Sequence, residues 1–112
     1  MPSQLNHLII AAHNKQESAQ FLAELLRLGA PVTAGFFLAV KLDNDVTLDY
    51  VETQIDFQPQ HYAFLVSDDV FDYAFSCIQE RGIEYWADPR RTKPNEINTN
   101  DDGRGLYFLD PS

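Results

Sequence analysis

The sequence has almost no cysteine. Cys77 is the only one among 112 residues. A disulfide within the chain and a structural zinc site of four cysteines are therefore both excluded. We interpret Cys77 as a buried thiol that packs like a small apolar side chain.

Long apolar segments are also missing. Uninterrupted runs such as Leu8 to Ala12 fall far short of the roughly 20 residues that a membrane-spanning helix needs. No basic segment precedes this run, as one would in a signal peptide. We therefore expect a soluble, cytoplasmic protein that does not act in a membrane.

Basic residues are few. Eight lysines and arginines face seventeen acidic residues, which gives a formal net charge of −9. A surface of this charge repels the phosphate backbone, so nucleic acid is not an expected partner. Small molecules, cationic ones included, remain compatible with it, although high acidity is also a common way to stay soluble.

What the chain does contain is an internal repeat. Leu5 to Ala12 forms an apolar strand with His7 at its third position, and Asn14 caps a helix that ends at Gly29. Three further strands are expected after this helix: a short segment up to Ala34, then Phe36 to Leu42 and Val46 to Glu52.

The second copy starts in the same way. Gln60 to Val66 repeats the apolar strand and carries His61, and Ser67 or Asp68 caps a helix that ends at Gly82. The two histidines are 54 positions apart and the two glycines 53. Strands are then expected at Ile83 to Ala87 and Leu106 to Leu109, with a long polar loop from Asp88 to Arg104 between them.

The repeat predicts an α+β fold made of two βαβββ modules in one domain of residues 1–112. Module one covers residues 3–56 and module two covers residues 57–112. The second copy stops at the turn that begins with Asp110, so its last strand is missing from the chain or comes from elsewhere. Because an incomplete sheet leaves an open edge, we expect a homodimer.

Alternation along the strands places three chemically active side chains on one face. His7, Asp49 and His61 all fall on the side away from the helices. Two imidazoles and a carboxylate suit a divalent zinc, iron, nickel, cobalt or manganese ion. A lone histidine on a strand is more often a hydrogen-bonded core residue, and it is the repeat that favours metal binding.

These segments resemble the vicinal-oxygen-chelate superfamily, which contains glyoxalases, bleomycin-resistance proteins and dioxygenases. The likeness lies in LNHLIIA, TLDYVE, QHYAFLVSDD and GRGLYFLDPS. It implies a curved mixed sheet around a cavity, with His7 and His61 as first-strand metal ligands and Asp49 as the acidic ligand. The last ligand, usually a glutamate, would lie beyond Ser112. The resemblance further implies a metal that acts as a Lewis acid and holds a substrate through two adjacent oxygens.

Four more residues are candidates for binding a small-molecule substrate. Phe37, Trp86 and Tyr107 can wall the cavity. Core packing explains Phe37 better, and it explains Trp86 and Tyr107, which border the long loop, about equally well. Arg104 can recognise an anionic group, although a solvated loop is the simpler interpretation. No side chain stands out as the catalytic base.

Three functions therefore stay open. The leading hypothesis is a metal-dependent enzyme of the glyoxalase or dioxygenase type. The alternative is a non-catalytic protein that binds a bleomycin-type drug, for which the negative charge and the aromatic side chains speak. A scaffold without activity is the third, and the missing ligand leaves open whether the chain is an enzyme at all.

Overall fold

The computed structural model describes residues 2–99 and 103–112. It is an α+β fold with a mixed sheet. In this part of the chain the elements are β1 (His7–Ala12), α1 (Lys15–Leu25), β2 (Val32–Ala34), β3 (Phe37–Lys41), β4 (Thr47–Glu52), α2 (Asp68–Glu80), β5 (Tyr85–Trp86) and β6 (Tyr107–Phe108). None of the helices described is long and apolar enough to cross a membrane.

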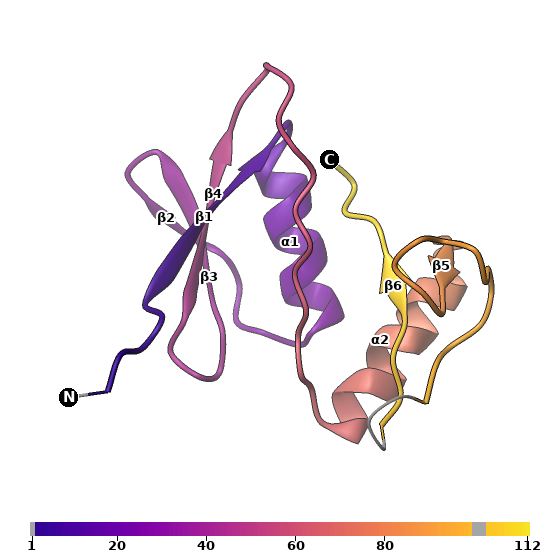
Figure 1. The fold of residues 1–112 in the computed structure, drawn as a ribbon. Coiled ribbons are helices and arrows are strands. Elements are labelled where there is room, and N and C mark those ends of the chain that lie inside the picture. Colours follow the sequence, from indigo (N-terminus) through magenta and orange to yellow (C-terminus); the bar gives the residue numbers. More distant parts are fainter. Residues whose placement is uncertain (1, 100–102) are drawn as a thin grey trace.

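The first half forms the larger sheet. Its strands lie in the order β1-β4-β3-β2, with β1 parallel to β4 and the other pairs antiparallel (Figure 1). The order strand, helix and three strands is the one that the sequence predicts for residues 3–56. Since β1 and β4 are neighbours, residues from the two ends of this half lie side by side.

Helix α1 begins where the sequence predicts and ends earlier. The side chain of Asn14 accepts a hydrogen bond from the backbone N–H of Glu17 at 3.0 Å. The expected end at Gly29 is wrong, because Arg27 adopts a positive φ of 56° and the Leu28 N–H bonds back to the Ala23 carbonyl at 2.8 Å. This is the geometry that usually favours glycine at a helix end, here adopted by an arginine.

Helix α2 has both ends where the sequence places them. Ser67 rather than Asp68 is the cap, accepting from the Val70 N–H at 3.3 Å. Gly82 takes the left-handed position that ends the helix, with a φ of 65°.

The strand expected at Gln60 to Val66 is not formed. This segment carries no strand assignment and runs alongside α1 in Figure 1. Phe64 and Val66 are half-buried and Leu65 between them is fully exposed, so the alternation of an extended chain is present. A strand also needs a neighbour for its backbone groups, and no strand in the described part of the chain lies beside this segment as β4 lies beside β1.

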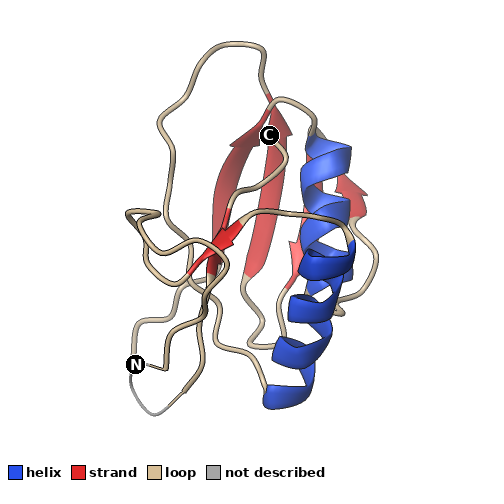
Figure 2. Ribbon diagram, turned by 90° about the vertical axis from the view of Figure 1, so that its right-hand side faces the viewer, coloured by secondary structure: helices blue, strands red, loops and turns tan. Residues whose placement is uncertain are grey.

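The rest of the second half forms a two-stranded sheet, in which β5 pairs with β6. Both strands are shorter than the expected Ile83 to Ala87 and Leu106 to Leu109. Figure 2, seen from the side of this half, shows the small sheet in front of the larger one.

Helix α1 is packed on two sides. One side contacts the inward side chains of the larger sheet in a core of Ala12, Ala19, Leu22, Ala23, Leu38, Val40, Leu48 and Tyr50. The other side, through Leu25 and Phe21, contacts Ile78, Tyr85 and Phe108 in a second core. The helix therefore lies between the larger sheet and the second half (Figure 1).

The C-terminal turn is fastened to α1 by polar contacts. The carboxylate of Asp110 accepts hydrogen bonds from the Ser18 hydroxyl at 2.6 Å and from the Ser112 N–H at 2.9 Å. Ser18 is completely buried, and these contacts satisfy its hydroxyl. These polar contacts join the two halves in addition to the apolar contacts around Leu25.

We expect the Leu25 core to hold the two halves together. Replacing Leu25 by alanine removes a completely buried side chain and should lower the free energy of unfolding by about 2–5 kcal/mol. Denaturant unfolding followed by circular dichroism measures this loss. Leu5→Ala, at a leucine that is more than half exposed, is the control. Equal effects of the two substitutions would contradict the arrangement of the second core.

Candidate functional site

The face of the larger sheet that points away from α1 has no covering element in the described part of the chain. The strand register sorts its side chains into three rows across the sheet. The rows are His7, Thr47 and Lys41; then Ile9, Asp49, Ala39 and Val32; then Ala11 and Val51 with Phe37 and Ala34. We call this surface the open face. It is polar at the His7 row and apolar at the Ala11 row.

Two of the three predicted metal ligands lie together on the open face. His7 is opposite Thr47 and Asp49 is opposite Ile9 on the parallel pair β1 and β4, so the two ligands are diagonal neighbours. The Nδ1 of His7 lies 2.9 Å from the Oδ1 of Asn6. Among the described residues, none forms a hydrogen bond or ion pair with the carboxylate of Asp49. Both ligands thus keep donor atoms free for a group outside the chain.

His61 lies on the other side of the larger sheet. Phe64, three residues on, packs against the core between α1 and the sheet. Tyr62 is close enough to Tyr50 in that core for its charge to act on Tyr50, whose pKa is raised mainly by burial and further by Asp110 and Tyr62. Residues 62–64 are therefore on the α1 side of the sheet, whereas His7 and Asp49 are on the open face.

The cavity that we expected the three ligands to share is consequently not formed within one chain. No group of three or more histidine, cysteine, aspartate or glutamate side chains in residues 2–99 and 103–112 is placed to hold a metal ion. The reason is that residues 60–66 do not form the expected strand, which would have placed His61 in a second sheet. The ligand roles of His7, Asp49 and His61 stay predictions.

In the second half, His61 lies among aromatic side chains that the sequence also singled out. Its ring meets the Tyr107 ring edge-on, with 5.6 Å between centroids. Tyr107 is the register partner of Trp86, so the two share a face of the β5–β6 pair. The guanidinium of Arg91 lies 5.7 Å from the centre of the Trp86 ring. One imidazole and two aromatic rings are thus gathered at one place.

Comparison with solved structures identifies the fold family. The oxidase ChaP-H1 superposes with a TM-score of 0.95 at 51% identity, over 98% of this chain and 89% of that chain. For the oxidase ChaP-H2 the TM-score is 0.95 at 53% identity, over 99% and 87%. A glyoxalase/dioxygenase from Nostoc punctiforme gives 0.68 at 22% identity over 96% and 84%, which supports the fold alone. The chain belongs to the vicinal-oxygen-chelate superfamily.

No protein-family model matches this vicinal-oxygen-chelate chain, and no curated protein does. The resemblance carried by LNHLIIA and GRGLYFLDPS is nevertheless confirmed by the two oxidases, which match nearly the whole chain.

The donor set on the open face fits the divalent ion that a vicinal-oxygen-chelate protein would hold. An imidazole nitrogen and a carboxylate are ligands for zinc, iron and related ions. The second nitrogen of the His7 ring is occupied by Asn6, an arrangement usual for metal-binding histidines. His7 and Asp49 alone are an incomplete set, which a third donor would have to complete.

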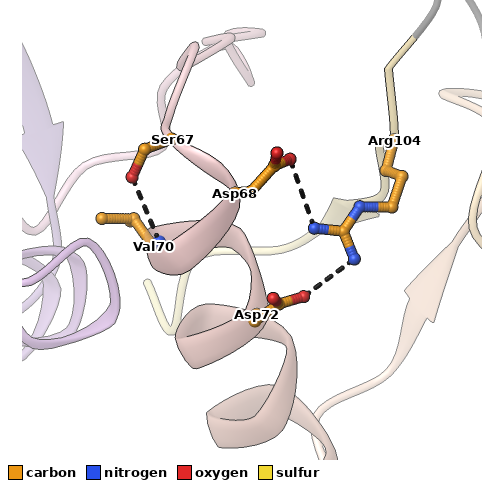
Figure 3. Close-up of polar contacts among 5 residues, drawn as sticks. All are labelled: Ser67, Asp68, Val70, Asp72 and Arg104. Atoms are coloured by element: carbon orange, nitrogen blue, oxygen red, sulfur yellow. Dashed lines mark hydrogen bonds and ion pairs between the residues drawn. The ribbon is translucent and has the colours of Figure 1, made fainter.

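Arg104, predicted to bind substrate, is bound to α2 (Figure 3). Its guanidinium lies 2.8 Å from Asp72 and 3.4 Å from Asp68, and 4.5 Å from the centre of the Phe71 ring. The hydrogen bond to Asp72 raises the pKa of Arg104, with Asp68 adding to it. Two carboxylates thus neutralise this cation, and it fixes the end of the loop to α2. Its role in binding a substrate stays a prediction.

Phe37 is half-buried on the open face, and its ring meets the ring of the exposed Phe36 edge-on. It therefore lies on the same surface as Asp49. Asn6 was missed by the sequence reasoning. A signal was present, because an amide side chain precedes the histidine in both copies, Asn6 before His7 and Gln60 before His61.

We expect the pair of Arg104 and Asp72 to contribute to stability. A double-mutant cycle with Arg104→Met and Asp72→Asn should give a favourable coupling energy that is above the error of the measurement, because the two ions are directly bonded at 2.8 Å. The pair of Lys41 and Asp45, which is mostly exposed, is the control and should couple by close to zero. Absence of coupling between Arg104 and Asp72 would show that Asp72 does not hold the guanidinium, which would then be available to a ligand.

Proposed function

We propose that this chain is an oxidase of the vicinal-oxygen-chelate superfamily, a metal-dependent enzyme of the dioxygenase type. It acts on a small molecule with two adjacent oxygens, with molecular oxygen as the oxidant. The observation that carries the proposal is the pair of His7 and Asp49 on the open face. Sequence identity above 50% to two proteins named as oxidases supports oxidation as the type of reaction.

His7 and Asp49 would hold the ion, which belongs to the zinc, iron, nickel, cobalt and manganese class. Iron, manganese or cobalt would suit an oxidase, since these ions change their oxidation state. Once bound, the ion would supply Lewis-acid and redox chemistry to the adjacent oxygens of the substrate. The chain's own contribution is an apolar floor of Ala11, Val51 and Phe37 beside Asp49, which would exclude water and hold the body of the substrate.

The third ligand would come from a second copy. In one chain the core around α1 separates His61 from the open face, so an intact set needs module one, residues 3–56, of one copy and module two, residues 57–112, of the other. The open face and the residues flanking it expose large apolar side chains, among them Leu5, Ile9, Val32 and Phe36. An exposed apolar surface of this kind marks an association site. We therefore infer a homodimer in which two βαβββ modules from different copies enclose each site, with His61 of the partner subunit as the third ligand.

The metal site is tested by metal analysis of the purified protein. Wild type should hold about one divalent ion per chain, and His7→Ala and Asp49→Ala should each weaken binding roughly tenfold or more, because each removes a direct ligand. His13→Ala is the control, since His13 bonds to the Thr53 carbonyl and lies beyond the end of β1. If His7→Ala retains as much metal as wild type, the proposal of a metal-dependent oxidase is contradicted. Stabilisation of metal-free protein by a bleomycin-type ligand would then favour the drug-binding alternative.

The shared site is tested by mixing two inactive variants. His7→Ala and His61→Ala are unfolded together in equal amounts, refolded, and analysed for bound metal. In a mixed dimer one site has lost both histidines and the other has kept both, so random pairing restores roughly a quarter of the sites. Each variant refolded alone is the control and should bind almost none. No recovery in the mixture, with mixed dimers shown to form by mass spectrometry, would mean that the ligands come from the same chain.

A further inference from the structure

The imidazole of His7 is held by the side chain of the residue before it. Its Nδ1 lies 2.9 Å from the Oδ1 of Asn6. The backbone of Asn6 is itself fixed, because its carbonyl accepts the N–H of Thr47 at 3.0 Å and so extends the pairing of β1 with β4. The Asn6 side chain therefore starts from a point anchored to the sheet beside the open face.

The partner atom decides which ring nitrogen carries the proton. An amide Oδ1 can only accept a hydrogen bond, so the Nδ1 of His7 must donate and carry the hydrogen. In the neutral ring the Nε2 then has a free lone pair. No described residue forms a hydrogen bond with this Nε2, so it is available to a metal ion.

The other two histidine rings are held by different kinds of contact. His13 donates its Nδ1–H to the backbone carbonyl of Thr53 at 3.0 Å. The His61 ring has no hydrogen-bond partner among the described residues and is placed instead by the edge-on contact with Tyr107. The three imidazoles are thus held by a side chain, by the backbone and by an aromatic ring.

We propose that Asn6 is a positioning residue, which fixes the Nδ1–H tautomer and the orientation of His7 so that Nε2 faces outward as a metal ligand. The proposal rests on the proposed function for the identity of the ligand, and on the hydrogen bond for the tautomer. Asn6 itself does not touch the ion.

The tautomer is measured in the metal-free protein by long-range proton–nitrogen NMR spectra of the histidine rings. We expect the Nδ1–H form for His7 and His13 and a mixture with the Nε2–H form for His61. Asn6→Leu should convert His7 to such a mixture and leave His13 unchanged. Asn6→Asp, which keeps an acceptor at the same place, should retain the Nδ1–H form. A His7 tautomer that ignores Asn6→Leu overturns the proposal.

Zinc alone, titrated into the same three proteins, connects the tautomer to binding. Asn6→Leu should weaken zinc affinity about tenfold and Asn6→Asp should restore it, as expected for a residue that orients a ligand. If the tautomer changes and the affinity does not, Asn6 is not a positioning residue for a metal. If zinc leaves the His7 signals of wild type unmoved while the tautomer still depends on Asn6, the metal-dependent function fails and the tautomer assignment stands.

Discussion

The packing of α1 on both of its sides is the constraint that governs the arrangement of this protein. The helix buries Leu22 and Ala23 against the larger sheet and Leu25 against the second half. A helix so enclosed cannot let the second half swing to the open face without giving up one of its two cores. Burial of this extent is worth several kcal/mol, which is comparable with the whole stability of a small domain. The two histidines are therefore kept on opposite sides of the sheet by the same contacts that fold the chain.

This constraint divides the chemistry into two incomplete sets of residues. The open face has the two proposed metal ligands His7 and Asp49, with an apolar floor and no third donor within the described residues. The second half has an imidazole with two aromatic rings, and no carboxylate of residues 57–99 or 103–112 is bonded to it. Each set contains what the other one lacks, so a second copy of the chain is the simplest source of a complete site.

Features that depend on residues close together in the sequence could be predicted, whereas features that depend on distant residues could not. The caps at Asn14 and Ser67, the end of α2 at Gly82 and the face assignments of His7 and Asp49 depend on residues a few positions apart, and the structure has them as expected. The strand at residues 60–66 depends on a neighbouring strand, which no local pattern can guarantee. The commitment of Arg104 to Asp68 and Asp72 likewise depends on residues more than thirty positions away.

The segment that was predicted wrongly also indicates why association and activity should be coupled. Residues 60–66 run as an extended chain in Figure 1, and at its end the half-buried Phe64 and Val66 flank the fully exposed Leu65. Their backbone has no strand beside it in the part of the chain that the structure describes. A chain in this state lacks only a partner for its hydrogen bonds and apolar face to become a strand. If that partner belongs to another copy, the contact that orders this segment is also the contact that brings in His61. Occupancy of the metal site and stability of the fold would then both rise with protein concentration, because both draw on the same free energy of association.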